Sequence, residues 1–315
     1  MKSFKSIGMW FLLLGFLTIT SCSDDDDPVI EDKSIATIAT ETANLSILVE
    51  ALQKADLVSV LDGTDDYTVF APTNDAFGDL LAANGFNSLD DVPTATLTSI
   101  LLNHVVNGTV MSSALTTSYV KTNATEATTG NNLDLYINTD GGVRLNGVSS
   151  VTTADITASN GVIHIVDAVI GLPTVVTFAT ADSTFETLVA ALTRADLTTD
   201  FVGVLSGSGP FTVFAPTNDA FGNLLTELGA AGLGDIDVNT LDAVLKYHVV
   251  NGANVLASTL TDDMTVTTLQ GSDFTIDLDN GAEIVDANGR RSGIIVTDVQ
   301  SSNGVVHVIN KVLLP

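Results

Sequence analysis

Four histidines are the side chains of this 315-residue protein best suited to act as acid, base or metal ligand near neutral pH. They occupy two sequence contexts: His104 and His248 each begin the segment HVVNG, and His164 and His307 each lie in an Asn-Gly-hydrophobic-hydrophobic-His stretch. Because each context occurs twice, its histidine belongs to a repeated module. We expect partly buried rings satisfied by hydrogen bonds, near Asp75 or Asp219 for the first pair, with a ligand or catalytic role as the alternative.

A longer repeat explains why these contexts are duplicated. The segment Tyr67–Leu81, YTVFAPTNDAFGDLL, recurs 144 residues later as Phe211–Leu225, with 13 of 15 residues identical. Solenoid repeats are about 20 to 50 residues long, so a repeat of this length is a whole globular domain. We predict two tandem domains, residues 35–173 and residues 174–315. The join at Leu172–Thr174 is short and is not rich in Gly or Ser, so we expect the domains to pack together or to move only modestly.

The repeated segment contains the signals for a strand, a turn and a helix. β-forming residues precede Pro72, which ends the strand, and Thr73 can cap a helix whose first turn contains Asp75. Thr217 and Asp219 are the equivalent residues of the second copy. We expect the threonine and aspartate of each copy to have a structural role at the start of this helix.

The second part of each copy has the pattern of strands. Leu133, Leu135 and Ile137 alternate with polar residues, and Gly141-Gly142 marks a hairpin. The stretch from Val162 to Ile170 is apolar on both faces, which predicts a strand in the middle of a sheet. Helices mostly first and strands mostly last predict an α+β fold with a twisted sheet or sandwich.

Three blocks occur in the same order in each copy: the FAPTNDAF box, an H-x-V-x-G segment, and a closing Asn-Gly-hydrophobic-His strand. Together they resemble the fasciclin-like domain, and the resemblance covers Ile35 to Pro315. It implies two tandem fasciclin-like domains, each with N-terminal helices packed on a twisted β-sheet or sandwich. It also implies an adhesion module that needs no cofactor.

The resemblance marks one candidate partner-binding site. In animal fasciclin-like proteins, a Tyr-His pair at the end of the helix before the H-x-V-x-G segment is associated with integrin binding. Tyr247-His248 matches this pair, whereas the first copy has Asn103-His104. The structural alternative is a tyrosine packed at a helix end.

Residues 1–21 have the features of a lipoprotein signal peptide. Lys2 and Lys5 precede an apolar run that is shorter than the roughly 20 residues of a membrane span. Ile19-Thr20-Ser21-Cys22 resembles a bacterial lipobox, in which the cysteine is lipidated and becomes the mature N-terminus. Cys22 is the only cysteine, so no intramolecular disulfide competes for it.

Residues 22–34 are predicted to form an acidic, hydrated tether, because the run Asp24–Asp27 cannot bury apolar surface and repels itself. Acidic residues just after the lipidated cysteine also resemble the surface-export signal of Bacteroidetes lipoproteins. This predicts an outer-membrane lipoprotein displayed at the cell surface. The alternative is a spacer on a lipoprotein that faces the periplasm.

Composition and motifs exclude several other functions. A net charge of −27 with 11 basic residues argues against nucleic acid as a partner, because that affinity depends on Lys and Arg. The sequence contains no HExxH, GxSxG, Walker or cysteine-cluster motif, so we predict no metal and no cofactor. The stretch from Asp277 to Gly281 superficially resembles a calcium loop. It lacks the later Glu of an EF-hand and fits a hairpin turn, with Asn280-Gly281 at its tip.

These observations predict a non-enzymatic binding protein of the cell envelope. The N-terminal lipid is expected to attach it to the membrane, and its domains to contact an unidentified protein or polysaccharide. The alternative is a small-ligand-binding protein or an enzyme that uses an acidic pocket.

Overall fold

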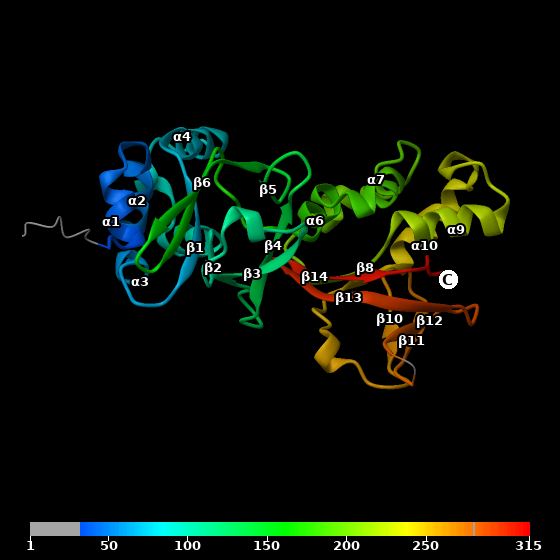
Figure 1. Ribbon diagram of the computed structural model, residues 1–315. Coiled ribbons are helices and arrows are strands. Elements are labelled where there is room, and N and C mark those ends of the chain that lie inside the picture. Colours follow the sequence, from blue (N-terminus) through cyan, green and yellow to red (C-terminus); the bar gives the residue numbers. More distant parts are fainter. Residues whose placement is uncertain (1–31, 280) are drawn as a thin grey trace, which may run out of the picture. The chain divides into compact units, whose positions relative to one another are not determined.

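Each half of the chain begins with helices and ends with strands, which confirms the predicted α+β class (Figure 1). The computed structural model describes residues 32–279 and 281–315, so Cys22, the run Asp24–Asp27 and Asn280 lie outside the described residues. We use the terms domain 1 and domain 2 for the predicted ranges 35–173 and 174–315.

Both domains have the same sequence of elements. The helices of domain 1 are α1 (Ile35–Glu41), α2 (Ser46–Lys54), α3 (Val58–Leu61), α4 (Asn74–Ala83) and α5 (Thr94–Leu102), with 3-10 turns η1 (Ala43–Leu45), η2 (Leu89–Asp91) and η3 (Ser112–Ala114). Its strands are β1 (Tyr67–Pro72), β2 (Val105–Asn107), β3 (Ser118–Thr125), β4 (Asn132–Asn138), β5 (Arg144–Leu145), β6 (Ser149–Ala158) and β7 (Gly161–Val166).

Domain 2 repeats this order with its own lengths. Its helices are α6 (Val175–Ala181), α7 (Glu186–Leu192), α8 (Phe201–Leu205), α9 (Asn218–Leu228) and α10 (Val238–Tyr247), with 3-10 turns η4 (Ser183–Phe185), η5 (Leu233–Asp235) and η6 (Ala257–Thr259). Its strands are β8 (Phe211–Pro216), β9 (Val249–Asn251), β10 (Thr265–Thr267), β11 (Asp273–Asp277), β12 (Glu283–Val285), β13 (Arg291–Ser301) and β14 (Gly304–Ile309).

The two sheets share one strand order but differ in closure. In domain 1, β1 to β7 form a closed barrel, because β2 pairs with β3 at Val106 and Thr122. In domain 2 the order is β10-β11-β12-β13-β14-β8-β9, and the corresponding β9 approaches the segment after β10 through a hydrogen bond from Leu269 N–H to Val249 O. The central strands β7 and β14 each pair in parallel with the first strand of their domain and antiparallel with the preceding strand. The predicted central position of the strand beginning at Val162 is therefore confirmed.

The turn before each central strand explains the repeated Asn-Gly. The side chain of Asn160 accepts a hydrogen bond from Ile35 N–H and donates to the carbonyls of Leu61 and Gly63, so one amide secures the start of α1 and the end of α3. Gly161 follows with φ +140, and a Cβ there would meet the Tyr67 carbonyl oxygen at 1.9 Å. Only glycine fits a backbone this close to its neighbour.

Each domain buries two apolar clusters. One lies between the helices and the sheet, around Phe77 in domain 1 and Phe221 in domain 2, and the other lies between the strands, around Phe70 and Phe214. These four phenylalanines are at most 1% exposed and all belong to the repeated FAPTNDAF segment. The repeat therefore supplies the centre of both clusters in both domains.

The outer face of β4 is buried, contrary to the simple alternation predicted for this strand. Leu133, Leu135 and Ile137 face the core, but Asp134 and Tyr136 between them are only 4% and 2% exposed. They are covered by domain 2. Lys121 Nζ donates to the Asp134 carboxylate at 2.6 Å, and the same carboxylate oxygen accepts from Gln300 N–H on β13 at 2.6 Å.

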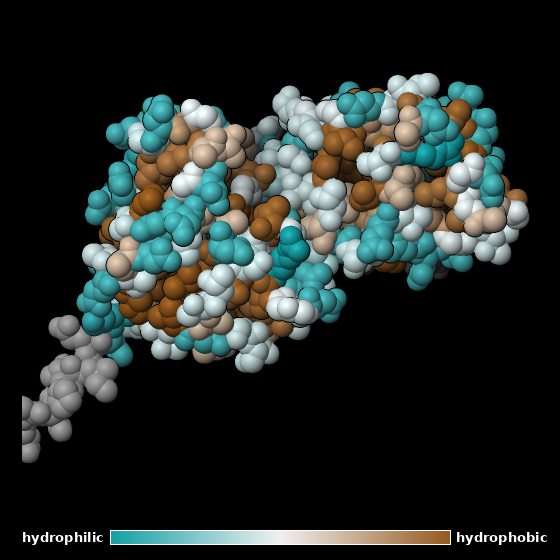
Figure 2. All heavy atoms as spheres, turned by 90° about the horizontal axis from the view of Figure 1, so that it is seen from above, coloured by the Kyte–Doolittle hydropathy of each residue, from teal (hydrophilic) through white to brown (hydrophobic). Residues whose placement is uncertain are grey.

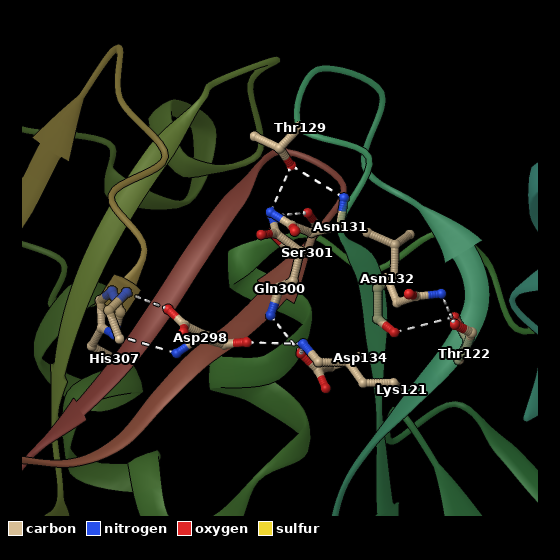
Figure 3. Close-up of polar contacts among 12 residues, drawn as sticks. Lys121, Thr122, Thr129, Asn131, Asn132, Asp134, Asp298, Gln300, Ser301 and His307 are labelled. Atoms are coloured by element: carbon tan, nitrogen blue, oxygen red, sulfur yellow. Dashed lines mark hydrogen bonds and ion pairs between the residues drawn. The ribbon is translucent and has the colours of Figure 1, made fainter. Parts of the chain in front are cut away.

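A bulge on β13 completes this polar contact, which Figure 3 shows. Asp298 lies in the bulge with φ +59, and its carbonyl accepts a second hydrogen bond from Lys121 Nζ at 3.0 Å. Burial raises the pKa of Asp134, and the Lys121 ammonium opposes this rise. Lys121 thus joins a carboxylate of its own domain to the backbone of the next.

A second contact between the domains is aromatic. Tyr119 and Tyr136 face each other across β3 and β4, and their hydroxyls donate to the two carboxylate oxygens of Asp182 at 2.9 and 3.3 Å. Asp182 also accepts from Thr184 N–H at 2.9 Å and so caps η4. Tyr119 packs edge-on against Phe178, and Tyr136 belongs to the apolar cluster of domain 2.

Domain 2 lacks this aromatic pair at the matching place in its own sheet. In β10 and β11, the strands that correspond to β3 and β4, Thr265 stands opposite Thr275. The position equivalent to Asp182 in domain 1 is Thr42, whose hydroxyl donates to the Ile38 carbonyl within α1. The tyrosine and aspartate partners therefore occur once, at the contact between domain 1 and domain 2.

Replacing Asp182 by Ala is expected to lower the free energy of unfolding by about 2 kcal/mol, because a buried tyrosine hydroxyl loses its acceptor and η4 loses its cap. A double-mutant cycle with Tyr119→Phe separates the two effects. In the wild-type background Tyr119→Phe should cost about 1 kcal/mol, and in the Asp182→Ala background close to nothing. Chemical denaturation of all four proteins measures these values, and strictly additive losses would show that the two residues are not coupled.

The described residues contain no single helix that is both long and apolar enough to cross a membrane. Two helix pairs, α1 with α2 and α6 with α7, are long and apolar enough only when the two helices of a pair are taken together, and each pair is strongly bent between its members.

Candidate functional site

His104 and His248 fasten the end of a helix to the last segment of their domain. Nδ1 of His104 donates to the Ile100 carbonyl at 2.7 Å, and Nε2 accepts from Ile170 N–H at 2.8 Å. His248 repeats this with Val244 O at 2.7 Å and Leu313 N–H at 2.9 Å. Since Nε2 accepts a hydrogen bond from a backbone N–H, both rings are neutral and carry their own proton on Nδ1.

His164 and His307 use the opposite tautomer. Nδ1 of His164 accepts from Asp155 N–H at 3.1 Å, and Nε2 donates to the Val110 carbonyl at 3.0 Å. His307 makes the same two bonds with Asp298 N–H at 3.3 Å and Val255 O at 2.8 Å. The acceptor Nδ1 supports the bulge in β6 or β13, where Asp155 and Asp298 both adopt positive φ.

Burial favours the neutral form of His104, His248 and His307. His104 and His248 are 2% and 3% exposed, and burial lowers the pKa of each to about 4, against a smaller opposing effect of the backbone hydrogen bond. Burial also lowers the pKa of His307. With both nitrogens of each ring bonded to backbone groups, the four histidines have no ring atom left for a metal or a substrate.

The hydrogen-bond partners of the first pair differ from those expected. Asp75 and Asp219 do not bond His104 or His248, because both ring nitrogens in each case already bond the backbone. The aspartates lie instead in the first turns of α4 and α9, where their charge favours the positive helix end. Thr73 and Thr217 cap these helices by accepting from Ala76 and Ala220 N–H at 3.2 Å.

The Tyr247-His248 pair is inside domain 2. Tyr247 is 0% exposed, and its hydroxyl donates to the Asp273 carbonyl at 2.7 Å and accepts from Ala287 N–H at 3.1 Å. Because His248 is also buried and fully bonded, a macromolecule cannot touch either side chain in this structure. The surface of domain 2 available to a partner therefore lies elsewhere.

A polar groove of about 680 Å³ opens on domain 2. One wall is the start of α9, and the other is formed by β12, β13 and the residues after β14. The lining comprises Thr184, Thr217, Asn218, Asp219, Asn223, Glu283, Arg291, Gly293, Ile295, Asn310 and Lys311. The repeated box thus forms part of a surface feature as well as the core.

Hydrogen bonds hold the two walls of the groove. Asn218 accepts from Thr187 N–H and donates to the Ser183 carbonyl, both at 2.8 Å, which fixes α9 against α7. Asn310 accepts from Gly293 N–H at 2.9 Å, which fixes the opposite wall. The groove is therefore a preformed surface.

The charges of the groove are mixed. Arg291 donates to the Glu283 carboxylate at 2.7 Å and pairs with Asp277, and this hydrogen bond lowers the pKa of Asp277. Asp277, the first residue of the calcium-like stretch, is thus occupied by a guanidinium. Ammonium, guanidinium, amide and carboxylate groups lie around Ile295, which is 54% exposed.

This lining offers both hydrogen-bond donors and acceptors to a ligand. The described residues that form it include neither histidine nor cysteine. Within residues 32–279 and 281–315, no group of three or more His, Cys, Asp or Glu residues could hold a metal ion. The sequence predicted only a structural role for Thr217 and Asp219 on the α9 wall, and it did not indicate Glu283, Arg291 or Ile295, because no motif joins β12 and β13 to α9.

Comparison with known proteins assigns the family. The fasciclin domain model matches residues 43–173 and again residues 183–315. The chain belongs to the fasciclin domain family. A solved fasciclin domain pair from the insect cell adhesion molecule fasciclin I has the same fold, with a TM-score of 0.53, 19% identity, and coverage of 87% of this chain and 98% of that one.

Relatives with other names share these fasciclin domains. Transforming growth factor-beta-induced protein ig-h3 of Sus scrofa is 30% identical over 257 residues, which is 81% of this chain. Cell surface glycolipoprotein MPB83 of Mycobacterium bovis is 35% identical over 144 residues, or 45% of this chain. The chain matches 35% of the length of ig-h3 and 60% of the length of MPB83.

Proposed function

We propose that this fasciclin-domain protein is a surface-displayed lipoprotein that binds a macromolecule, a polysaccharide or a protein, through the polar groove of domain 2. The observation that carries the proposal is the groove itself, with preformed walls and side chains that both donate and accept hydrogen bonds. Such a surface matches a polymer rich in hydroxyl or amide groups.

The relatives support the location and the type of function. Fasciclin I is a cell adhesion molecule, and MPB83 is a cell surface glycolipoprotein. In this chain, lipidation of Cys22 would attach the protein to the outer membrane, and residues 22–34 would hold the domains away from it. A net charge of −27 keeps such a surface soluble and disfavours nucleic acid.

The groove gives a specific prediction for binding. On an array of glycans and matrix proteins, with and without calcium, the full chain should bind at least one class, and Asn223→Trp should reduce that binding at least tenfold. Asn223 is exposed in the groove, so an indole there blocks access without disturbing the core. Asp79→Trp is the matched control, because Asp79 is the equivalent residue of domain 1. Equal loss in both variants, or in neither, would exclude the groove as the binding surface.

The anchor is tested on intact cells. An alkyne fatty acid should label the wild-type protein but not Cys22→Ala, and external protease should remove the domains from whole cells. Label that persists in Cys22→Ala would exclude this residue as the attachment point. Complete protection from protease would place the domains on the periplasmic side.

A further inference from the structure

Domain 2 contains a second, chemically different cavity beneath α6, α7 and α8. Its volume is about 260 Å³, and its walls are mostly apolar residues of these helices, of η4 and of β8 and β14, among them Phe185, Leu188, Phe201, Val213 and Val306. Protein interiors are normally packed without voids larger than a water molecule. An apolar cavity of this size is therefore an exception to normal packing.

The few polar side chains of the lining already use their hydrogen-bond donors within the protein. They are Thr180, Thr193 and His248. The hydroxyls of Thr180 and Thr193 donate to the Val176 and Val189 carbonyls at 3.0 and 2.8 Å, and both nitrogens of His248 bond the backbone. A water molecule needs two to four polar partners to stay in a cavity, so these walls favour a hydrocarbon instead.

The cavity lies beside a length difference between the two copies. From Leu57 to Tyr67 the chain advances 10 residues, whereas from Leu197 to Phe211 it advances 14, which is an insertion of four residues in domain 2. In domain 1 this segment is α3, whose Val58 and Val60 pack partly buried against the core. In domain 2 it contains α8.

The insertion leaves apolar residues at the surface of α8. Val202 and Val204 are 42% and 40% exposed, and Val202 also lines the cavity. Figure 2, seen from above, shows hydrophobic atoms reaching the surface of this half of the molecule. Thr180 and Thr193 are also exposed lining residues, so these two threonines and Val202 mark the entrance of the cavity.

We propose that domain 2 binds a hydrocarbon group, an alkyl chain or an aromatic ring, in the cavity beneath α6, α7 and α8. The part of the ligand that enters the cavity carries no charge and no hydrogen-bonding group. Any polar head group of the ligand stays at the entrance beside Val202. Dry apolar cavities of about 150 Å³ bind benzene, so a volume of about 260 Å³ accepts a larger ring or a medium-length chain. This site is separate from the polar groove and does not depend on the function proposed for it.

Two probes test the proposal on the full chain. Toluene represents a ligand with an aromatic ring, and decanoate represents a ligand with an alkyl chain. Isothermal titration should show one site for at least one probe. Hydrogen exchange with mass spectrometry should show added protection in α6, α7 and α8 and none in the equivalent helices α1, α2 and α3. Binding of toluene alone identifies an aromatic ligand, and binding of decanoate alone identifies an acyl chain.

Two valines on one helix provide the matched variants. Val202→Asp places a charge at the entrance and should weaken binding at least tenfold. Val204→Asp, with similar exposure but outside the lining, should leave binding unchanged. Both residues are exposed, so both proteins are expected to fold. The proposal fails if neither probe binds, if protection appears equally in both domains, or if the two variants lose binding equally.

Discussion

Lowering the pH from 7 to 4 is expected to reduce the free energy of unfolding of each domain by about 3 kcal/mol through a single buried histidine, His104 in domain 1 and His248 in domain 2. Burial lowers the pKa of both rings to about 4, whereas an exposed histidine in the unfolded chain has a pKa near 6.5. Above pH 6.5 both states are neutral and the full stability is present. As the pH falls from about 6.5 to about 4, the histidine becomes protonated in the unfolded chain but stays mostly neutral in the folded domain. The free energy of unfolding therefore decreases.

Carboxylates also titrate in acid, so the histidine contribution needs its own control. A protein with both His104→Gln and His248→Gln has amides that do not titrate, and its stability should depend less on pH between 6.5 and 4.5. Denaturation at several pH values compares it with the wild type, and NMR titration of the rings reads their pKa directly. Parallel stability curves, or rings that titrate near pH 6.5, would contradict the assignment.

Replacing His248 by Ala is expected to lower the free energy of unfolding of domain 2 by about 3 to 5 kcal/mol. The change leaves the Val244 carbonyl and the Leu313 N–H buried without partners, and each unsatisfied group costs about 1 to 3 kcal/mol. Removing the ring also enlarges the neighbouring cavity. Calorimetry should show the loss in the transition of domain 2.

His104→Ala is an internal replicate, since the same two bonds exist in domain 1. It should lower the transition of domain 1 by a similar amount. Asn223→Ala, at an exposed position, should change stability by no more than about 0.5 kcal/mol. A histidine variant with unchanged stability that has lost a defined binding activity would make the ring a functional group.

The sequence predicted those parts of the fold that depend on neighbours within one copy. The strand that ends at Pro72, the cap at Thr73 and the central position of β7 follow from short patterns, and each was present twice. The hairpin at Gly141 and Gly142 also lies where it was expected, between β4 and β5, with positive φ at both glycines. Local turn and strand chemistry is sufficient for such elements.

Contacts that depend on how two elements meet in space could not be predicted. In the sequence, Asp182 is not distinguished from the other acidic residues, yet its carboxylate accepts hydrogen bonds from two tyrosines of the other domain. Asp134 reads as the polar member of an alternating strand, but it is buried beneath Gln300. The two walls of the groove come from segments about 70 residues apart, α9 and β12–β13.

The threonine pair of domain 2 means that the order of the two domains matters. Exchanging the order of the two domains would place Thr265 and Thr275 against the neighbouring module, where they offer no aromatic ring. Tyr119 and Tyr136 would then face water as an unpartnered apolar patch. The copies are therefore not interchangeable, although their core segments are almost identical. A few side chains that differ on one pair of strands thus determine which domain comes first and which comes second.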